Sequence, residues 1–463
     1  MKRKSRINGF APARAAVIIF VCTAAIMPLH AQAWKLSAAE AVSAALSEDS
    51  RITGALFDVE SGKARLEEAR FAKLPSLSLN AGYTRLSPGD SQIDLGVTSI
   101  AFKTQEDAYT LGVNFQYPVF AGFRLEQAVE MARLNESGKE AAYKGILNAV
   151  AFETRRAYWE AFRAERGVVM FTENLALAKR NEELTKSRYE EGTVLQADLL
   201  AAVMRSAQAE MDLENAEMHK EMAFLSLSAA VSEHGSTEAV PDFTLTSEPG
   251  VIDLPDDASF LNGALDDTAL LENAASNRSE MKAAAIAESV SAVNTAMSKA
   301  PLYPTLALRG NYTYANPNSQ VPFSSGSGFI GTWNLGVSLS YDIGAVPKTL
   351  AAAQAGNALA AKQKEDSAKV RERISLDVRN CLLVFRQTGK DIASLNKVLE
   401  QARENERVTG QRLKSGTAGD IDALTASVAR MKAEYAIVSR QIDRQIAAAD
   451  LYRALGYGAD RPQ

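Results

Sequence analysis

Cysteine and histidine are almost absent from this sequence of 463 residues, which has two of the first and three of the second. None of them stands at a spacing typical of metal ligands or of a nucleophile and its base. The sequence also lacks the glycine-rich GxxxxGKS/T loop that binds nucleotide phosphates. We therefore expect a protein that is not an enzyme, that needs no metal or cofactor, and that takes any energy for its work from a partner.

An excess of positive charge is absent as well. The chain has 51 Lys and Arg residues against 56 Asp and Glu residues, and five of the basic ones lie in the first 33 positions, which hold no acidic residue. The remainder, with 46 basic against 56 acidic residues, has a net charge of −10. An acidic chain without a basic patch is a poor candidate for nucleic-acid binding, so we expect no nucleic-acid partner.

The N-terminal segment has the pattern of an export signal. Its five basic residues precede an apolar run over 15–27, and Ala31-Gln32-Ala33 follows as a small-x-small cleavage site. We expect residues 1–33 to be a signal peptide. The alternative is a membrane-anchoring helix, for which the run falls short of the roughly 20 residues of a span. Cleavage removes Cys22 and leaves Cys381 alone, so no disulfide is expected within the mature chain.

One stretch of the sequence, residues 187–200, recurs as residues 411–424. The recurring residues Arg188, Gly192, Thr193, Asp198 and Leu200 become Arg412, Gly416, Thr417, Asp422 and Leu424, always 224 positions later. Similarity at a fixed distance indicates a duplicated architecture. Glycine allows the positive φ that ends a helix, and the oxygen of the following threonine can start the next one. Each copy is therefore predicted to be the tip of a long antiparallel helical hairpin.

Four segments alternate apolar residues with small or polar ones, as strands with one apolar face do. They lie near 76–83, 109–117, 305–314 and 333–341, and they pair into two β-hairpins at about 75–118 and about 304–343. Tyrosine, phenylalanine and tryptophan belong to the apolar series. The polar series includes Thr110, Asn114, Gln116, Arg309, Asn311, Ser338 and Ser340.

Long helices are predicted between and after these hairpins. Proline is missing over 119–240 and over 348–461, and one helix over 120–186 would be about 100 Å long at ~1.5 Å per residue. Apolar seams with 3,4 spacing support extended helix packing. One seam is Ala197, Leu200, Met204, Ala207, Met211, Glu214 and Met218; the other is Ile421, Leu424, Val428, Met431, Tyr435, Val438 and Ile442.

The mature chain therefore divides into two structural repeats. The first spans 34–231, with its helical tip near 188–198, and the second spans 268–463, with its tip near 412–422. Residues 232–267 between them contain three prolines and many acidic residues, which is typical of a linker.

The apolar strand faces suit contact with lipid, but four strands leave two open edges. In a membrane every backbone polar group must be paired, and about eight strands are the fewest in closed membrane barrels. A membrane barrel would therefore have to be shared among chains. A soluble four-stranded sheet covered by helices is the alternative, although the flanking helices are too long to fold back over so small a sheet.

The sequence resembles the outer-membrane efflux proteins typified by TolC. The resemblance rests on Leu74-Pro75-Ser76-Leu77 entering the first strand, Tyr117-Pro-Val-Phe-Ala-Gly122 leaving the second, the tip at 188–193, and the duplicated order of these motifs. It implies an α+β membrane protein located in the outer membrane of a Gram-negative bacterium and extending into the periplasm. It further implies a homotrimer that shares a 12-stranded transmembrane β-barrel, four strands from each protomer, continued by a long periplasmic α-helical coiled-coil barrel.

The resemblance also implies partners and site residues. The protein would be the exit duct of a tripartite efflux pump or type I secretion system, passively conducting substrates from a periplasmic adaptor and an inner-membrane RND or ABC-type transporter. Asp420 and Asp422 would form a pore constriction, for which helix capping is the alternative role. The adaptor-contacting tip residues would be Arg188, Gly192, Thr193, Arg412, Gly416 and Thr417. The polar series of the strands would line the barrel lumen, and the apolar series would face outer-membrane lipid.

Three departures from the family pattern concern the tip of the second repeat and the exit from its second strand. Thr425 replaces a second acidic residue one turn after Asp422, and Ala418 stands where an arginine is often found, so the chain departs here from the double acidic constriction of the family. The segment 341–347 departs from the usual strand exit of the second hairpin. The alternative function is a periplasmic coiled-coil scaffold without a pore, which would leave the aromatic-bordered hairpins unexplained.

Overall fold

The computed structural model describes residues 34–87, 90–94, 99–103, 106–231, 243–252, 254, 267–318 and 328–457. The expected signal peptide, with Cys22 and the first histidine, lies outside these residues, as do His234 and most of the expected linker.

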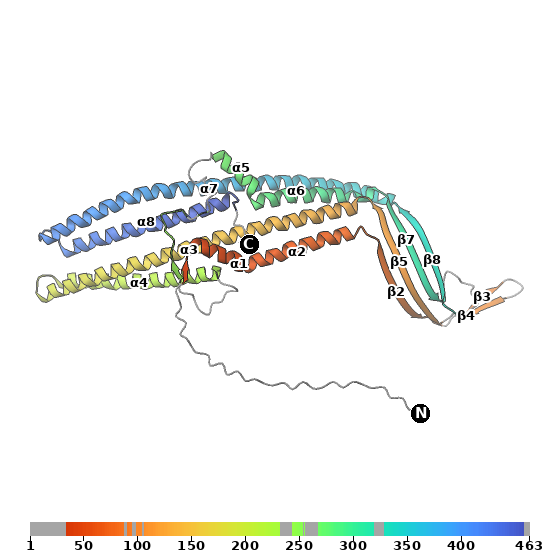
Figure 1. The fold of residues 1–463 in the computed structure, drawn as a ribbon, viewed down its shortest axis with the longest axis horizontal. Coiled ribbons are helices and arrows are strands. Elements are labelled where there is room, and N and C mark those ends of the chain that lie inside the picture. Colours follow the sequence, from red (N-terminus) through yellow and green to blue (C-terminus); the bar gives the residue numbers. More distant parts are fainter. Residues whose placement is uncertain are drawn as a thin grey trace, which may run out of the picture.

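Two very long helices run the length of the helical part of the molecule (Figure 1). They are α3 (Arg124–Glu190, 67 residues) and α7 (Val346–Lys414, 69 residues), each about 100 Å long at ~1.5 Å per residue. The single helix expected over 120–186 is present as α3, although it begins and ends four residues later. Shorter helices flank them: α1 (Ala38–Glu48), α2 (Ser50–Phe71), α4 (Gln196–Val231), α5 (Asp267–Asn277), α6 (Ser279–Ser298) and α8 (Asp420–Ala454).

The flanking helices divide the helical part into two halves along its length. Near the sheet the neighbours follow the order α2, α3, α6, α7, and toward the tips they follow the order α4, α3, α8, α7 (Figure 1). Each half is a single layer, in which every helix packs side by side with the next helix in that order. No helix among the described residues is both long and apolar enough to cross a lipid bilayer.

The four strands expected from the alternation form one antiparallel sheet in the order β2, β5, β7, β8. Their bounds are Ser76–Arg85, Asp107–Ala121, Thr305–Asn316 and Ile330–Ser340. A register shift between Pro118 and Phe120 marks a bulge near the end of β5. A second hairpin, β3 (Asp90–Asp94) with β4 (Ser99–Lys103), extends beyond the sheet at the end away from the helices (Figure 1).

The middle of the molecule is tied together by a small parallel pair of strands that was not foreseen. β1 (Trp34–Leu36) pairs with β6 (Phe243–Leu245), which lies inside the segment expected to be only a linker. The buried hydroxyl of Tyr158 donates to the Leu36 carbonyl at 3.0 Å and accepts from the Ser247 N–H at 3.1 Å. Tyr158 also packs with Trp159 and Phe162 in a buried core that reaches from α1 to α8. This core fixes the start of the described chain against both helical hairpins.

The two apolar seams expected on the helices differ in burial. On α8, Met431 and Ile442 are buried. On α4 the expected seam is exposed within this chain, with Met204 73% and Met211 53% exposed. The face of α4 that packs on α3 instead carries small residues, Ala202, Ser206, Ala209 and Ala216. Methionines and alanines two positions apart lie about 200° apart around the helix, so the methionine seam faces away from α3.

Candidate functional site

The sheet has one apolar face and one polar face, and the strand register fixes both. On the apolar face Leu79 lies beside Val113, which lies beside Tyr312, which lies beside Trp333. These side chains are not covered within the chain: Leu79 is 76% exposed and Trp333 75%. A broad apolar face on a protein surface indicates contact with lipid or another protein.

Aromatic clusters border this face at both ends. At the end near β3 and β4, Tyr83 and Tyr109 have ring centroids 5.1 Å apart, and Tyr314 stacks on Phe329 at 5.1 Å. At the helical end, Phe120, Phe123 and Tyr303 pack edge to face, with Phe120 and Phe123 at 5.1 Å. About ten strand residues separate the clusters, or ~35 Å at ~3.3 Å each, which a tilt near 45° reduces to the ~25 Å apolar band of outer-membrane strands.

The polar face is held by a chain of side-chain amides across three strands. The Asn114 amide donates to the Asn80 carbonyl oxygen at 2.9 Å, and the Asn311 amide donates to Asn114 at 2.5 Å. The Thr313 hydroxyl donates to Asn311 at 2.6 Å. Asn114 and Asn311, both expected lumen residues, thus lie on one face. The register places the other expected lumen residues Thr110, Gln116, Arg309, Ser338 and Ser340 on the same face.

The strand-to-helix junction after β5 depends on two consecutive residues with positive φ. Gly122 has φ 62° and Phe123 has φ 65°, a conformation that glycine adopts readily and phenylalanine rarely does. A Cβ at position 122 would lie 2.4 Å from the Ala300 carbonyl oxygen, so glycine is required there. The strained Phe123 is stabilised by the aromatic cluster with Phe120 and Tyr303. The junction therefore turns the chain from the sheet into α3 at a fixed angle.

The two hairpin tips have the same backbone structure. Gly192 has φ 74° and Gly416 has φ 69°, which confirms the expected helix-ending role. The following threonines act differently from expectation. The Thr193 hydroxyl donates to the Arg188 carbonyl, and the Thr417 hydroxyl donates to the Arg412 carbonyl. Each threonine therefore completes the end of the preceding helix rather than starting the next one, because the free carbonyls of a helix end need donors.

The start of the next helix is capped in both copies by aspartate. The Asp198 carboxylate accepts from the Leu195 N–H at 3.1 Å, and the Asp422 carboxylate accepts from the Gly419 N–H at 3.1 Å. Asp422 thus makes the same contact as its counterpart in the first repeat. The capping role that the sequence left open for Asp422 is observed.

Asp420 has a different partner, on the other hairpin. Its carboxylate forms an ion pair with the guanidinium of Arg188, and the Asp420 side chain is only 19% exposed. The repeat counterpart of Asp420 is Gln196, which has no charge, and the counterpart of Arg188 is Arg412, which donates to the Thr417 carbonyl of its own tip at 3.4 Å. The ion pair therefore links the two tips and breaks the symmetry of the repeats.

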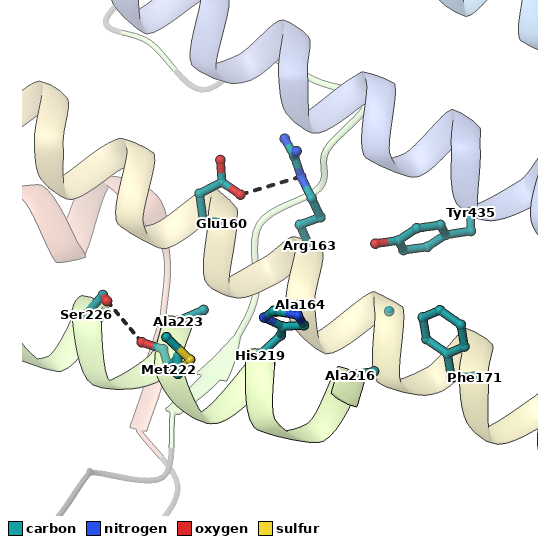
Figure 2. Close-up of a pocket in the computed structure, with 11 residues that line it drawn as sticks. Glu160, Arg163, Ala164, Phe171, Ala216, His219, Met222, Ala223, Ser226 and Tyr435 are labelled. Carbon is teal, nitrogen blue, oxygen red and sulfur yellow. Dashed lines mark hydrogen bonds and ion pairs between the residues drawn. The ribbon is translucent and has the colours of Figure 1, made fainter. Parts of the chain in front are cut away.

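A groove runs along α3 between α4 and α8. The larger of its two hollows has a volume of about 400 Å³ and is lined by Glu160, Arg163 and Gly167 of α3, His219 and Met222 of α4, and Tyr435 of α8. Figure 2 shows Arg163 extending from α3 toward α8, and Tyr435 of α8 lying over α3. Arg163 pairs with Asp443 of α8 at 2.5 Å, and burial raises the pKa of Tyr435. A second hollow continues the groove toward the tips, between Asn174 and Ile421.

Known proteins share this architecture. The structure of the outer-membrane channel OprN matches with a TM-score of 0.74 at 19% identity, over 91% of this chain and 90% of that one. CusC, whose structures concern folding and transmembrane channel formation, matches with a TM-score of 0.73 at 16% identity, over 92% and 94% of the two chains. The fold is therefore that of outer-membrane channels with a helical extension.

The family follows from the sequence comparison. The model of the outer membrane efflux protein family matches residues 41–233 and 270–457, and the chain belongs to this family. Outer membrane protein TolC of Vibrio cholerae serotype O1 is 25% identical over 323 residues, which cover 68% of this chain and 67% of the relative. The protein is thus an efflux protein of the Gram-negative outer membrane that extends into the periplasm, and this family consists of channels rather than enzymes.

Sequence reasoning missed several of these features. The alternation of apolar and polar residues in Trp34-Lys35-Leu36 and Phe243-Thr244-Leu245 is the signal that could have indicated β1 and β6, but three residues are too few to distinguish a strand from chance. The pairing of Arg188 with Asp420 had no local signal, because its members lie on different hairpins.

Proposed function

We propose that three copies of this chain close into one duct that conducts substrates passively across the outer membrane. A periplasmic adaptor and an inner-membrane transporter of the RND or ABC type would deliver the substrates. The chain has no nucleotide-binding glycine loop, so the driving energy is assigned to the transporter.

The proposal rests on which elements lie at the two edges of the sheet and of each helical layer. The sheet has β2 at one edge and β8 at the other. The helical layer near the sheet runs from α2 to α7, and the layer near the tips runs from α4 to α7. Each time an element of the first half of the chain lies at one edge and an element of the second half at the other. Such head-to-tail surfaces generate a ring where the rotation closes.

Ring closure would satisfy the strand edges. Three chains with four strands each give twelve strands. The smallest membrane barrels have about eight, so twelve are enough to close a barrel. Pairing β8 of one chain with β2 of the next would leave no unpaired backbone groups in lipid, where each would cost several kcal/mol. The amide-bearing face would then line a wet lumen, and the face with Leu79 and Trp333 would contact lipid.

The exposed seam of α4 supports the same closure in the helical part. Met204, Met211, Met218 and Leu225 repeat every seven residues, the spacing of a coiled-coil seam, and all four are at least 43% exposed in the single chain. In a ring this seam would pack against α7 of the adjacent chain, where Leu376 and Leu383 are also exposed.

The tips would serve as the gate and as part of the adaptor contact. With Asp420 paired to Arg188 and Asp422 capping α8, the tips are tied in one position, and we propose that opening separates Arg188 from Asp420. Both aspartates would lie at the constriction. The adaptor would contact the tips through Arg188, Gly192, Thr193, Arg412, Gly416 and Thr417 and would place a helix in the groove along α3, as amphipathic helices do in grooves of this kind.

The test is the detergent-corrected native mass of the mature protein extracted from membranes. We expect three protein chains per particle. A Met204→Glu/Met211→Glu variant should dissociate, because it places charge in the seam, whereas Glu217→Lys, on another face of α4, should remain trimeric. A wild-type monomer that stays soluble without detergent would contradict the duct and favour a periplasmic scaffold.

A further inference from the structure

The polar face of the sheet carries one charged side chain among the described residues of β2, β5, β7 and β8, and that side chain is Arg309. The other side chains on this face are amides, hydroxyls and small or apolar groups. These four strands contain one acidic residue, Asp107 of β5. Asp107 lies on the opposite face of the sheet, where its carboxylate accepts from the Tyr83 hydroxyl at 2.8 Å.

The neighbours of Arg309 across the sheet leave its charge uncompensated. The register places it in one row with Ser76, Gln116 and Gly336. None of these has a charge, and a Cβ at Gly336 would meet no atom within 4 Å, so the space beside the arginine is open. Arg309 is exposed and makes no hydrogen bond or ion pair with any residue that the structure describes.

The next row holds the surrounding face in place. It contains Ser78, Asn114, Asn311 and Asn334, and the amide chain through Asn114 and Asn311 links β5 to β7. Because Asn311 lies two residues from Arg309 on the same strand face, this chain of hydrogen bonds fixes the side of the sheet from which the guanidinium projects.

We infer that Arg309 forms an anion-attracting collar inside the barrel and that it biases the duct toward anions and negatively charged solutes such as carboxylates. The inference rests on the proposed function, since threefold closure would bring three copies of Arg309 to one level of the lumen. Unpaired guanidinium groups attract carboxylates and other anions, and rings of arginine are a known device of anion-selective pores.

The dimensions of such a barrel allow the collar to act on the whole lumen. Twelve strands spaced ~4.8 Å apart and tilted by ~40° give a backbone radius of roughly 12 Å. The screening length is ~10 Å at 0.1 M salt and ~3 Å at 1 M. At low salt an anion on the axis therefore feels all three charges, and we expect a roughly two- to fivefold local enrichment of anions; at 1 M salt the effect should vanish.

The experiment is the reversal potential of the reconstituted trimer in planar lipid bilayers under a KCl gradient. Arg309→Gln should shift the reversal potential toward cation selectivity, Arg309→Glu should shift it further, and Arg309→Lys should match the wild type. Ser338→Gln adds a side chain of similar size to the same face without charge and should cause no shift. The shift should disappear when the same concentration ratio is kept and both compartments hold at least ~1 M salt.

Three results would overturn the inference. Equal reversal potentials for wild type, Arg309→Gln and Arg309→Glu in conducting trimers would remove Arg309 from the conduction path while leaving the channel intact. A shift of the same size with Ser338→Gln would assign the effect to bulk rather than charge. Absence of conductance from wild type and from a variant with the tip ion pair removed, Arg188→Gln, would overturn the proposed duct and the collar with it.

Discussion

At the scale of single residues, Cys381 shows how burial controls chemistry in the helical part. Its thiol is 3% exposed and lies 3.3 Å from a carboxylate oxygen of Asp450. Burial first, and the nearby charge of Asp450 second, raise the pKa of the thiol to about 12. Because the thiolate is the reactive form, the thiol stays protonated and inert at neutral and mildly alkaline pH.

We therefore predict that the folded protein resists alkylation at Cys381. A maleimide at about pH 8, near the ordinary thiol pKa of ~8.5, should label the native protein very slowly and the denatured protein at once. A Ser415→Cys variant, with its thiol at an exposed tip, is the matched control and should react in the native state. Rapid native labelling at position 381 would mean that the packing between α7 and α8 opens frequently.

Arg278 is the second residue with a large expected effect. Its side chain is 8% exposed and pairs with Asp377 of α7 at 2.6 Å and with Glu280 at 2.9 Å. Burial alone would raise the pKa of Glu280, but the hydrogen bonds and charge of Arg278 outweigh it and lower that pKa. This pair anchors the start of α6 on α7.

Replacing Arg278 by Met should lower the free energy of unfolding by about 1–3 kcal/mol, less than for a fully buried pair because both carboxylates remain partly hydrated. Arg386→Met, which breaks an exposed pair with Asp267, should cost under about 1 kcal/mol. Since the folded pKa of Glu280 is depressed, its share of stability is present above the unfolded pKa of ~4.3 and is lost as pH falls further. Denaturant melts at neutral and acidic pH should show the gap between wild type and Arg278→Met narrowing in acid; a constant gap would contradict the assignment.

At the scale of structural elements, the two hairpins are tied by the ion pair of Arg188 with Asp420. Arg188 is 48% exposed and Asp420 19%, and an ion pair so close to the surface contributes about 0.2–1 kcal/mol. One pair alone is therefore too weak to hold the tips closed. Three pairs that open together would contribute up to about 3 kcal/mol, or roughly a hundredfold change in the ratio of closed to open states. The geometry thus supports a gate only if the chains act together.

We expect Arg188→Gln and Asp420→Asn each to raise single-channel conductance or open probability in lipid bilayers. The exchanged pair Arg188→Asp/Asp420→Arg should restore the closed state. Arg412→Gln alters the counterpart of Arg188, whose guanidinium stays within its own tip, and should have little effect. If the exchanged pair is as open as the single variants, the contact between the tips does not control the gate.

At the scale of the whole molecule, the two structural repeats were predictable because their strands and helix ends have local sequence patterns. The alternation through Leu77 and Leu79 predicted β2, and the glycine of each tip predicted a helix end that its positive φ confirms. Faces were harder to assign than elements. The methionine seam of α4 has the correct period, but only the structure shows that alanines two positions away pack on α3, because a helix in a layer has two neighbours and hence two seams.

Contacts between distant segments had no such signal. In the sequence, the position of Asp420 fits a residue at the start of a helix as well as a residue of the constriction. Its ion-pair partner, Arg188, lies 232 positions away on another hairpin. The pairing of β1 with β6 depends on Tyr158, whose hydroxyl bridges the two segments from a third. Contacts of this kind depend on how the two repeats pack against each other. A single sequence has no local pattern that indicates this packing.

The open edges of the sheet have a genetic consequence. A chain with a mutation that prevents pairing at its β8 edge still has an intact β2 edge. Such a chain would join a ring through β2, but the ring could not close at its β8. Where sound and damaged chains are made in equal amounts and three close each ring as proposed, only about one ring in eight would consist of sound chains alone. Edge mutations in β8 would therefore be dominant over the wild-type allele, whereas mutations that unfold the chain before it meets a partner would be recessive.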